Sequence, residues 1–384
     1  MTDALVWLLA GLLAYVYLGY PLLVLLLSRL PAAPAAGDGS APMVSLIVPA
    51  HNEGSVIAAK TRNSLRLDYP KGRLEIIIAS DGSTDRTNEI VSGFSNQGVK
   101  LLALNPSRGK SAAQNAAVAG AKGDVLVFTD ANVVLRPDAL QKLARNFAHR
   151  RVGCVVGKVA YINNGDTSVS EGEGFYWRYE LFLREQESRL GNLAMGSGPI
   201  MAVRRQLFEP LDANVGEDFV LPMQVAMRGH RVVYEPEAIS EEILFQSSPA
   251  SMFKSKVRII TKDLRGLLLC RGILSPIRYP LYSWGLISHK LLRWLVPYFL
   301  VALFATNLLL FDQPFYRFTL AAQIVCYGLA GLGYLWQRTG TKPPRMLGIP
   351  FSFCLVNAAA AVGVARFLMG KKSGRWEPLR STAP

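Results

Sequence analysis

Residues 74–81 read LEIIIASD and residues 124–130 read DVLVFTD. Both runs are rich in β-branched and other apolar residues, which is typical of buried strands, and both end in an aspartate. Ligands of open α/β sheets bind beyond the carboxyl ends of the strands. Asp81 and Asp130 are therefore the first candidate site residues.

The same pattern extends outward from these two runs over residues 43–249. Further strand-like runs are VSLIVPA, VKLLALN and VGCVVGKVAY. Helical stretches lie near residues 53–67, 84–97, 109–121 and 137–149. This alternation predicts an α/β domain with a doubly wound, largely parallel sheet.

Apolar segments flank the α/β domain on both sides. Residues 4–28 carry no charge and exceed the roughly 20 residues that a membrane span needs. The run lacks a basic n-region and is too long for a signal peptide, so we expect a membrane anchor over residues 1–30, followed by a linker over 31–42. Transmembrane helices are expected over residues 291–370, where the apolar stretches lie near 292–311, 318–336 and 346–369.

The composition also indicates one polar domain joined to several spans. Hydrophobic residues make up 50% of the chain, mean hydropathy is +0.22 and net charge is +14. The basic residues are scattered and form no RNA- or DNA-binding motif, so we expect no nucleic acid partner. Cations beside apolar segments instead predict a multi-pass protein of the cell (inner) membrane with a cytoplasmic catalytic domain.

The C-terminal part poses a topological problem. Residues 250–290 are amphipathic and basic, and we expect them to lie in the membrane interface. Three full spans after a cytoplasmic domain would place the basic tail, residues 371–384, outside, against the positive-inside rule. Gly348, Pro350 and Asn357 interrupt the last apolar stretch. Whether that stretch spans the membrane or is re-entrant is open from the sequence.

Two motifs in the first half suit a nucleotide. Asp81 opens the motif DGSTD and has no evident capping role, so its carboxylate can accept bonds from the N–H groups of a base. Lys110 lies at the start of a small-residue helix, where its charge and the free N–H groups attract phosphate. The spacing is not that of Walker A, and a solvated basic turn is the alternative. The first strand ends in a turn with Pro49, Asn52 and Glu53, a weak signal that simple support of a helix start explains equally well.

Other acidic residues suggest metal and acid–base chemistry. Asp130 and Asn132 are two residues apart, so in an extended segment both project to one side and can hold a hard cation such as Mg²⁺ or Mn²⁺. A simple turn is the alternative. Glu217 and Asp218 precede an apolar helix. Acids suit a helix N-terminus for electrostatic reasons alone, but beside the other acids one of them can act as a general base.

Taken together, these motifs resemble the membrane-embedded family 2 glycosyltransferases related to cellulose, hyaluronan and poly-N-acetylglucosamine synthases. The resemblance covers residues 43–265 and follows the family's order of motifs. It implies a GT-A fold, a nucleotide-diphosphate sugar donor, most often a UDP-sugar, and Mg²⁺ or Mn²⁺. It further implies that Asp81 binds the nucleotide base and that Asp130 binds the metal and diphosphate. Asp218 would be the general base that takes the proton of the acceptor, and Gly198 would line the acceptor site.

The chain departs from the family pattern at two places. Asp-x-Asp has become Asp-Ala-Asn at residues 130–132, and of Gln-x-x-Arg-Trp only Arg258 remains. Arg258 can still stabilise the departing diphosphate. The missing Trp removes a stacking platform for a growing sugar chain, which favours single transfer to a lipid-linked or polysaccharide acceptor at the membrane.

We therefore expect an inverting glycosyltransferase with Asp218 as general base, Glu217 beside it and a metal at Asp130. A processive polysaccharide synthase is the alternative within the enzyme class. A catalytically silent membrane scaffold or sugar-lipid carrier is the alternative outside it.

Overall fold

The computed structural model describes residues 2–29, 41–163, 169–244, 248–341 and 343–371. The strands are β1 Val44–Ala50, β2 Leu74–Asp81, β3 Val99–Leu104, β4 Val125–Phe128, β5 Val133–Leu135, β6 Val152–Asn163, β7 Met201–Arg204 and β8 Arg231–Leu244. The helices are α1 Thr2–Ala14, α2 Tyr20–Leu27, α3 Ile57–Leu65, α4 Thr87–Ser92, α5 Lys110–Gly120, α6 Ala139–Arg145, α7 Val169–Arg189, α8 Glu217–Met227, α9 Pro249–Leu269, α10 Pro280–Leu286, α11 Leu292–Leu309, α12 Pro314–Gln337 and α13 Arg345–Leu368. Five-residue π segments, η1 Tyr15–Gly19 and η6 Ile287–Leu291, continue the helices on either side of them.

The eight strands form one sheet in the order β3-β2-β1-β4-β7-β6-β8-β5. The pairs among β3, β2, β1 and β4 are parallel, as is the long β6–β8 pair, whereas β7 and β5 pair antiparallel with their neighbours. Parallel alignment of β1, β2 and β4 places their carboxyl ends at one edge of the sheet. The residues after these strands are thus brought to one side of the domain.

The central strands are buried on both faces because helices cover the sheet from both sides. Every residue of β1 is buried, and alternate residues enter different cores. Ile47 packs in a core with α5, α8 and α9, whereas Leu46 and Val48 pack in a core with α3 and α6. The apolar run at β1 is therefore a consequence of two-sided burial.

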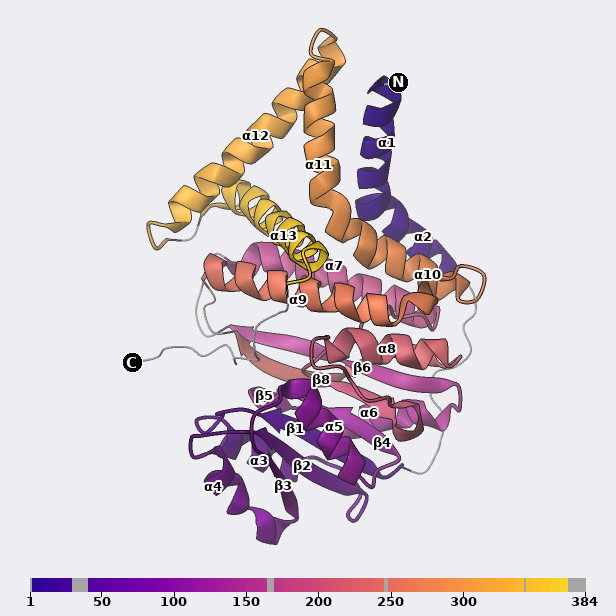
Figure 1. Cartoon of the computed structure of the whole chain (residues 1–384), viewed down its shortest axis with the longest axis vertical. Helices are drawn as coiled ribbons and strands as arrows, with labels where there is room; N and C mark the ends of the chain where they lie inside the picture. Colours follow the sequence, from indigo (N-terminus) through magenta and orange to yellow (C-terminus); the bar gives the residue numbers. More distant parts are fainter. Residues whose placement is uncertain (1, 30–40, 164–168, 245–247, 342, 372–384) are drawn as a thin grey trace.

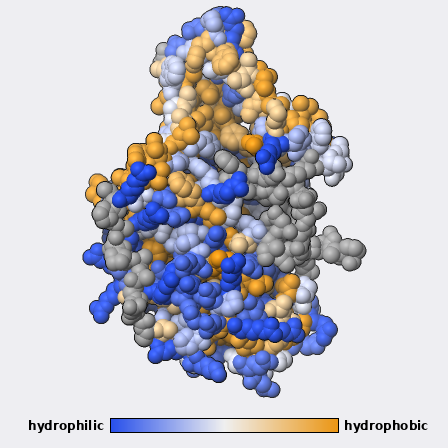
Figure 2. All heavy atoms as spheres, turned by 180° about the vertical axis from the view of Figure 1, so that it is seen from behind, coloured by the Kyte–Doolittle hydropathy of each residue, from blue (hydrophilic) through white to orange (hydrophobic). Residues whose placement is uncertain are grey.

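The apolar helices form a separate layer on one side of this domain. Figure 1 shows α7 and α9 lying across the top of the sheet domain, with α1, α11, α12 and α13 beyond them. Four helical rods of the described chain are long and apolar enough to cross a membrane: Thr2–Leu27, Pro280–Leu309, Pro314–Gln337 and Arg345–Leu368. Their outward side chains are exposed and apolar, and Figure 2 shows hydrophobic atoms gathered over this layer and hydrophilic atoms over the sheet domain.

The predicted α/β sheet with added apolar helices is confirmed, and the structure extends it. Strands β5, β7 and β8 were not predicted: three or four residues give little periodic signal in β5 and β7, and Pro236 and several glutamates interrupt the apolar pattern of β8. The amphipathic segment was expected over residues 250–290. Helix α9 covers only its first half, and from Pro280 onward the chain belongs to the apolar helical stretch Pro280–Leu309. Helix α13 is continuous despite Pro350.

Candidate active site

A cavity of about 1220 Å³ lies between the sheet domain and the apolar helices. Its lining combines the turns after β3 and β4, the N-termini of α5 and α8, one face of α9, and residues of α7, η1, α11 and α13. Of the predicted site residues, the lining includes Lys110, Asp130, Gly198, Glu217, Asp218 and Arg258. The structure thus brings six residues spread over about 150 positions into one space.

Lys110 links two of the acids. Its Nζ lies 2.6 Å from Asp130 Oδ1 and 2.5 Å from Glu217 Oε1. Lys110 begins α5 and Glu217 begins α8, so two helix N-termini meet near the turn after β4. Burial alone would lower the pKa of Lys110, but the two carboxylates outweigh it and raise that pKa. The pKa of Glu217 is lowered because Lys110 outweighs the effect of burial.

Gly198 faces this ion-paired group directly. A Cβ on Gly198 would lie 3.7 Å from Asp130 Oδ2, 3.8 Å from Glu217 Oε1 and 3.9 Å from Lys110 Nζ. The absence of a side chain keeps the space in front of the three charges open. Gly196 has a different role: its N–H donates to the Asp218 carbonyl at 2.7 Å, and a Cβ would lie 2.6 Å from that oxygen. Glycine at position 196 thus fixes this loop against the start of α8.

The pKa of Asp218 is shifted toward neutrality. Burial, followed by the negative charge of Glu217, raises its pKa to about 6. A carboxyl group with that pKa is mostly ionised at neutral pH and still accepts a proton more readily than an ordinary aspartate. Asp263 on α9 also lines the cavity, and burial and then Asp218 raise its pKa well above the usual range. Asp263 belongs to none of the sequence motifs, and it was not predicted to be a site residue.

Asp81 is not among the cavity-lining residues. It is 1% exposed, and its carboxylate accepts hydrogen bonds from Ser107 Oγ at 2.7 Å and from the N–H groups of Arg108 and Gly109 at 2.7 and 2.8 Å. Residues 107–109 do line the cavity. Asp81 therefore reaches the site through the loop that it holds, and its assignment to a base stays a prediction.

The predicted turn after β1 also lies behind the cavity rather than in its lining. Asn52 has a left-handed φ of 55°, and its Oδ1 accepts bonds from the N–H groups of Thr84 and Asp85 at 2.7 and 3.3 Å. The N–H of Glu53 donates to Thr87 Oγ1 at 2.8 Å. Pro49 is buried within β1. These residues tie the turn after β1 to the turn after β2.

The donor atoms around Asp130 decide whether the predicted metal site fits a divalent cation. Among the described residues, no group of three or more His, Cys, Asp or Glu side chains is placed to hold an ion. Asn132 is exposed and is not in the lining, but its Nδ2 donates to Glu242 Oε1 at 3.3 Å, and Glu242 does line the cavity. Burial and then Asp130 raise the pKa of Glu242 to about 7, so the two carboxyl groups lie near each other. Carboxylate oxygens from one or two residues, completed by substrate phosphate, fit Mg²⁺ or Mn²⁺.

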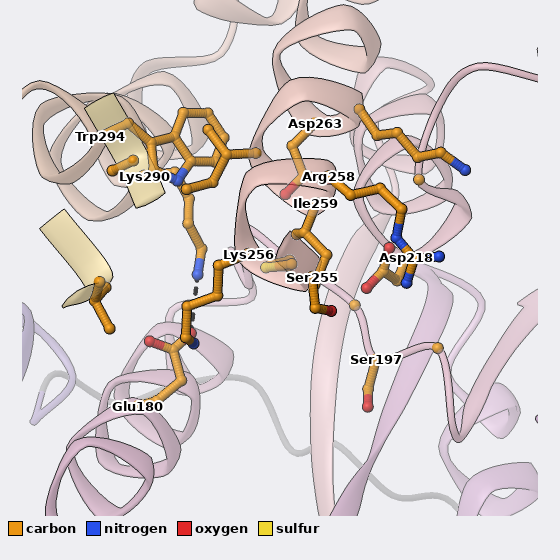
Figure 3. A pocket seen from close by; sticks show the side chains of 18 of the residues that line it. Glu180, Ser197, Asp218, Ser255, Lys256, Arg258, Ile259, Asp263, Lys290 and Trp294 are labelled. Carbon is orange, nitrogen blue, oxygen red and sulfur yellow. Dashed lines mark hydrogen bonds and ion pairs between the residues drawn. The ribbon is translucent and has the colours of Figure 1, made fainter. Parts of the chain in front are cut away.

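The wall toward the apolar helices carries both charged and apolar groups. Glu180 Oε1 accepts from Lys290 Nζ at 2.9 Å, and Glu180 Oε2 accepts from Arg293 Nη1 at 3.2 Å. Figure 3 shows this ion pair of Glu180 and Lys290 on one side of the pocket and Arg258 and Asp218 on the other. Apolar lining residues come from η1 and α13, among them Leu18, Phe353 and Val356.

Comparisons with known proteins show which families and folds the chain is similar to. Residues 45–211 match the family model described as "Glycosyl transferase family 2". The chain is 33% identical over 221 residues to a "Probable glycosyltransferase YdaM" of Bacillus subtilis (strain 168), covering 52% of this chain and 50% of that protein. It is 31% identical over 176 residues to a "Beta-monoglucosyldiacylglycerol synthase" of Nostoc sp. (strain PCC 7120 / SAG 25.82 / UTEX 2576), covering 45% of this chain and 38% of that protein.

A third curated relative and one solved structure extend further along the chain. An "N-acetylglucosaminyltransferase" of Sinorhizobium fredii (strain NBRC 101917 / NGR234) is 27% identical over 264 residues, covering 64% of this chain and 63% of that protein. This chain thus spans about half the length of the curated relatives it matches. The structure of mannosyltransferase PcManGT from Pyrobaculum calidifontis, in complex with GDP-Man and Mn²⁺, has a TM-score of 0.74, is 21% identical, and covers 97% of this chain and 100% of that chain. That likeness shows a shared fold.

Proposed function

We propose that this chain, whose residues 45–211 match the model of glycosyl transferase family 2, moves a sugar from a nucleotide-diphosphate sugar to the hydroxyl of an acceptor held at a membrane. The match over residues 45–211 supports the resemblance, and the shared fold agrees with the α/β domain that the motifs predicted. The observation that carries the proposal is the continuity of one cavity from the buried acids to the apolar helices. The proposed location is the inner membrane, with the sheet domain on the cytoplasmic side.

The donor is assigned to the part of the cavity near α5. The helix N-terminus and the loop of residues 107–109 offer N–H groups to phosphate, and Lys110 adds a full positive charge. Asp130 and Glu242 would hold a divalent cation, with Asn132 behind Glu242. When bound, the cation would neutralise charge on the leaving diphosphate. A UDP-sugar is the first candidate donor.

The proton transfer is assigned to Asp218. Its carboxylate takes the proton from the acceptor hydroxyl while the hydroxyl oxygen forms the new bond to the anomeric carbon. The bond from that carbon to the diphosphate breaks, and the nucleoside diphosphate leaves with the bonding electron pair. Attack in line with the leaving group inverts the configuration. Arg258, which also lines the cavity, would stabilise the departing charge.

The acceptor is assigned to the apolar end of the cavity. Tyr17 and Leu18 of η1 and Phe353 and Val356 of α13 line this end, and all four belong to rods long enough to span a membrane. A lipid acceptor can lay its hydrocarbon chain against these side chains while its head group reaches Asp218. One relative is named for a glucosylated diacylglycerol product, which is consistent with this class of acceptor.

The test is nucleotide release by the purified full chain in lipid nanodiscs with Mn²⁺. UDP- and GDP-sugars are supplied one at a time, with and without a bacterial lipid extract, and the products are sized. We expect one donor to release its nucleotide only when lipid is present and to yield a lipid carrying a single added sugar. A ladder of products would favour the processive synthase, and no turnover with any donor would favour the silent scaffold or carrier.

A further inference from the structure

Helix α9 presents two cations to the cavity. Arg258 and Lys262 are both lining residues and are four positions apart, so their side chains lie on one face of α9, one turn from each other. Lys262 is one turn beyond the only residue that remains of the family's Gln-x-x-Arg-Trp motif. No motif or comparison assigns it a role.

Three other cations around the cavity are already paired. Lys110, Lys290 and Arg293 each contact a carboxylate. Within the described part of the chain, neither Arg258 nor Lys262 has a hydrogen bond or an ion-pair partner. Burial, and the positive charges of Arg258 and Lys110 nearby, disfavour the charged form of Lys262 and lower its pKa, although Glu217 and Asp218 oppose the shift.

Holding two like charges together on a partly buried wall is unfavourable unless an anion joins them. Phosphate suits this pair, because a guanidinium offers a planar fork of donors and an ammonium offers a compact charge one turn away. We propose that Arg258 and Lys262 form a phosphate-binding pair, in which Lys262 is the unassigned member. The proposal rests on the proposed function, which supplies the diphosphate of the donor; a phosphate in the head group of a hydroxyl-bearing lipid acceptor is the second source of the same chemistry.

The experiment measures binding by calorimetry with the full chain in detergent and Mn²⁺ present. The probes are UDP and GDP against uridine and guanosine, and a short-chain phosphatidylglycerol, whose head group carries both phosphate and hydroxyl, against the matching diacylglycerol. The variants are Lys262→Met, Lys262→Arg and, as a matched control, Lys254→Met, because Lys254 is an exposed lysine of α9 outside the cavity lining. Thermal unfolding of each variant verifies that it is folded.

We expect Lys262→Met to bind one class of phosphate probe about tenfold more weakly, with the phosphate-free probes unchanged and Lys262→Arg close to wild type. Loss for UDP or GDP identifies the donor diphosphate, and loss for phosphatidylglycerol identifies the head group of the acceptor lipid. Wild-type affinity for every phosphate probe, or an equal loss for the phosphate-free probes, would overturn the proposal. If the wild-type protein binds the phosphate probes and Lys262→Met binds them more weakly, but the wild type transfers no sugar, the result contradicts the proposed function and leaves the phosphate-binding pair in place.

Discussion

Replacing Asp218 by asparagine should separate catalysis from stability. The pKa of this carboxyl rises from an ordinary 3.8 to about 6, which corresponds to about 3 kcal/mol at 1.36 kcal/mol per unit. A raised pKa means that the fold disfavours the ionised form. The fold therefore loses stability as pH rises from below 4 through about 6, and the loss is complete at neutral pH. Because Asp218 lines a cavity that solvent can enter, about 3 kcal/mol is an upper limit.

Asparagine cannot ionise, so Asp218→Asn should remove this penalty. At pH 7.5 we expect a Tm several degrees above wild type and, because the base is lost, kcat lower by about 10²- to 10⁴-fold. Donor binding should change little. The matched control is Asp68→Asn, an exposed aspartate remote from the cavity, for which neither Tm nor kcat should move.

The assays are thermal unfolding at pH 5 and pH 7.5, and nucleotide release with the lipid acceptor. The gain in Tm should be larger at pH 7.5 than at pH 5, because wild-type Asp218 is mostly neutral at pH 5. A variant that transfers sugar at the wild-type rate would refute the assignment of the base. A Tm below wild type at both pH values would refute the electrostatic reasoning.

Three further results are expected. The kcat/KM profile of the wild type should fall on the acidic side with a midpoint near pH 6, since Asp218 must be ionised to accept a proton; a profile flat down to pH 5 would contradict this. Gly196→Ala should lower the free energy of unfolding by about 1–3 kcal/mol and reduce kcat, because the added methyl lies 2.6 Å from the Asp218 carbonyl oxygen. The control is Gly120→Ala, whose added methyl would meet no neighbouring group within 4 Å. Both variants are measured by thermal unfolding. Val356→Trp should raise KM for the lipid acceptor about fivefold or more by filling the apolar end of the cavity, with donor binding unchanged; Leu335→Trp, on the exposed face of α12, should leave both constants at wild type.

Sequence patterns predicted much of what the cavity brings together. Lys110, Asp130 and Asp218 all follow a strand or begin a helix, where a parallel sheet directs polar residues to one edge. The order of the motifs was sufficient to group them, although they are far apart in the chain. Their roles stay predictions, because position at a site does not identify a chemical step.

Other features depended on contacts that no local pattern encodes. A carboxylate at a strand end can face a ligand or hold a neighbouring loop, and Asp81 does the second through residues 107–109. Glu242 approaches Asp130 only because β8 pairs with β5, about 110 positions away along the chain. Asp263 was not predicted as a site residue, because the mixed charged and apolar residues of α9 are also typical of a helix that lies on a membrane surface.

The central claim is that one cavity holds the donor diphosphate and the acceptor lipid at the same time. Its most direct test is a cryo-EM structure of the full chain in a nanodisc with Mn²⁺ and whichever of UDP or GDP binds. We predict diphosphate density between Asp130 and Arg258, and elongated lipid density along α13 that reaches toward Asp218. Nucleotide bound away from these residues, or a protein wall that separates the lipid from Asp218, would contradict the account.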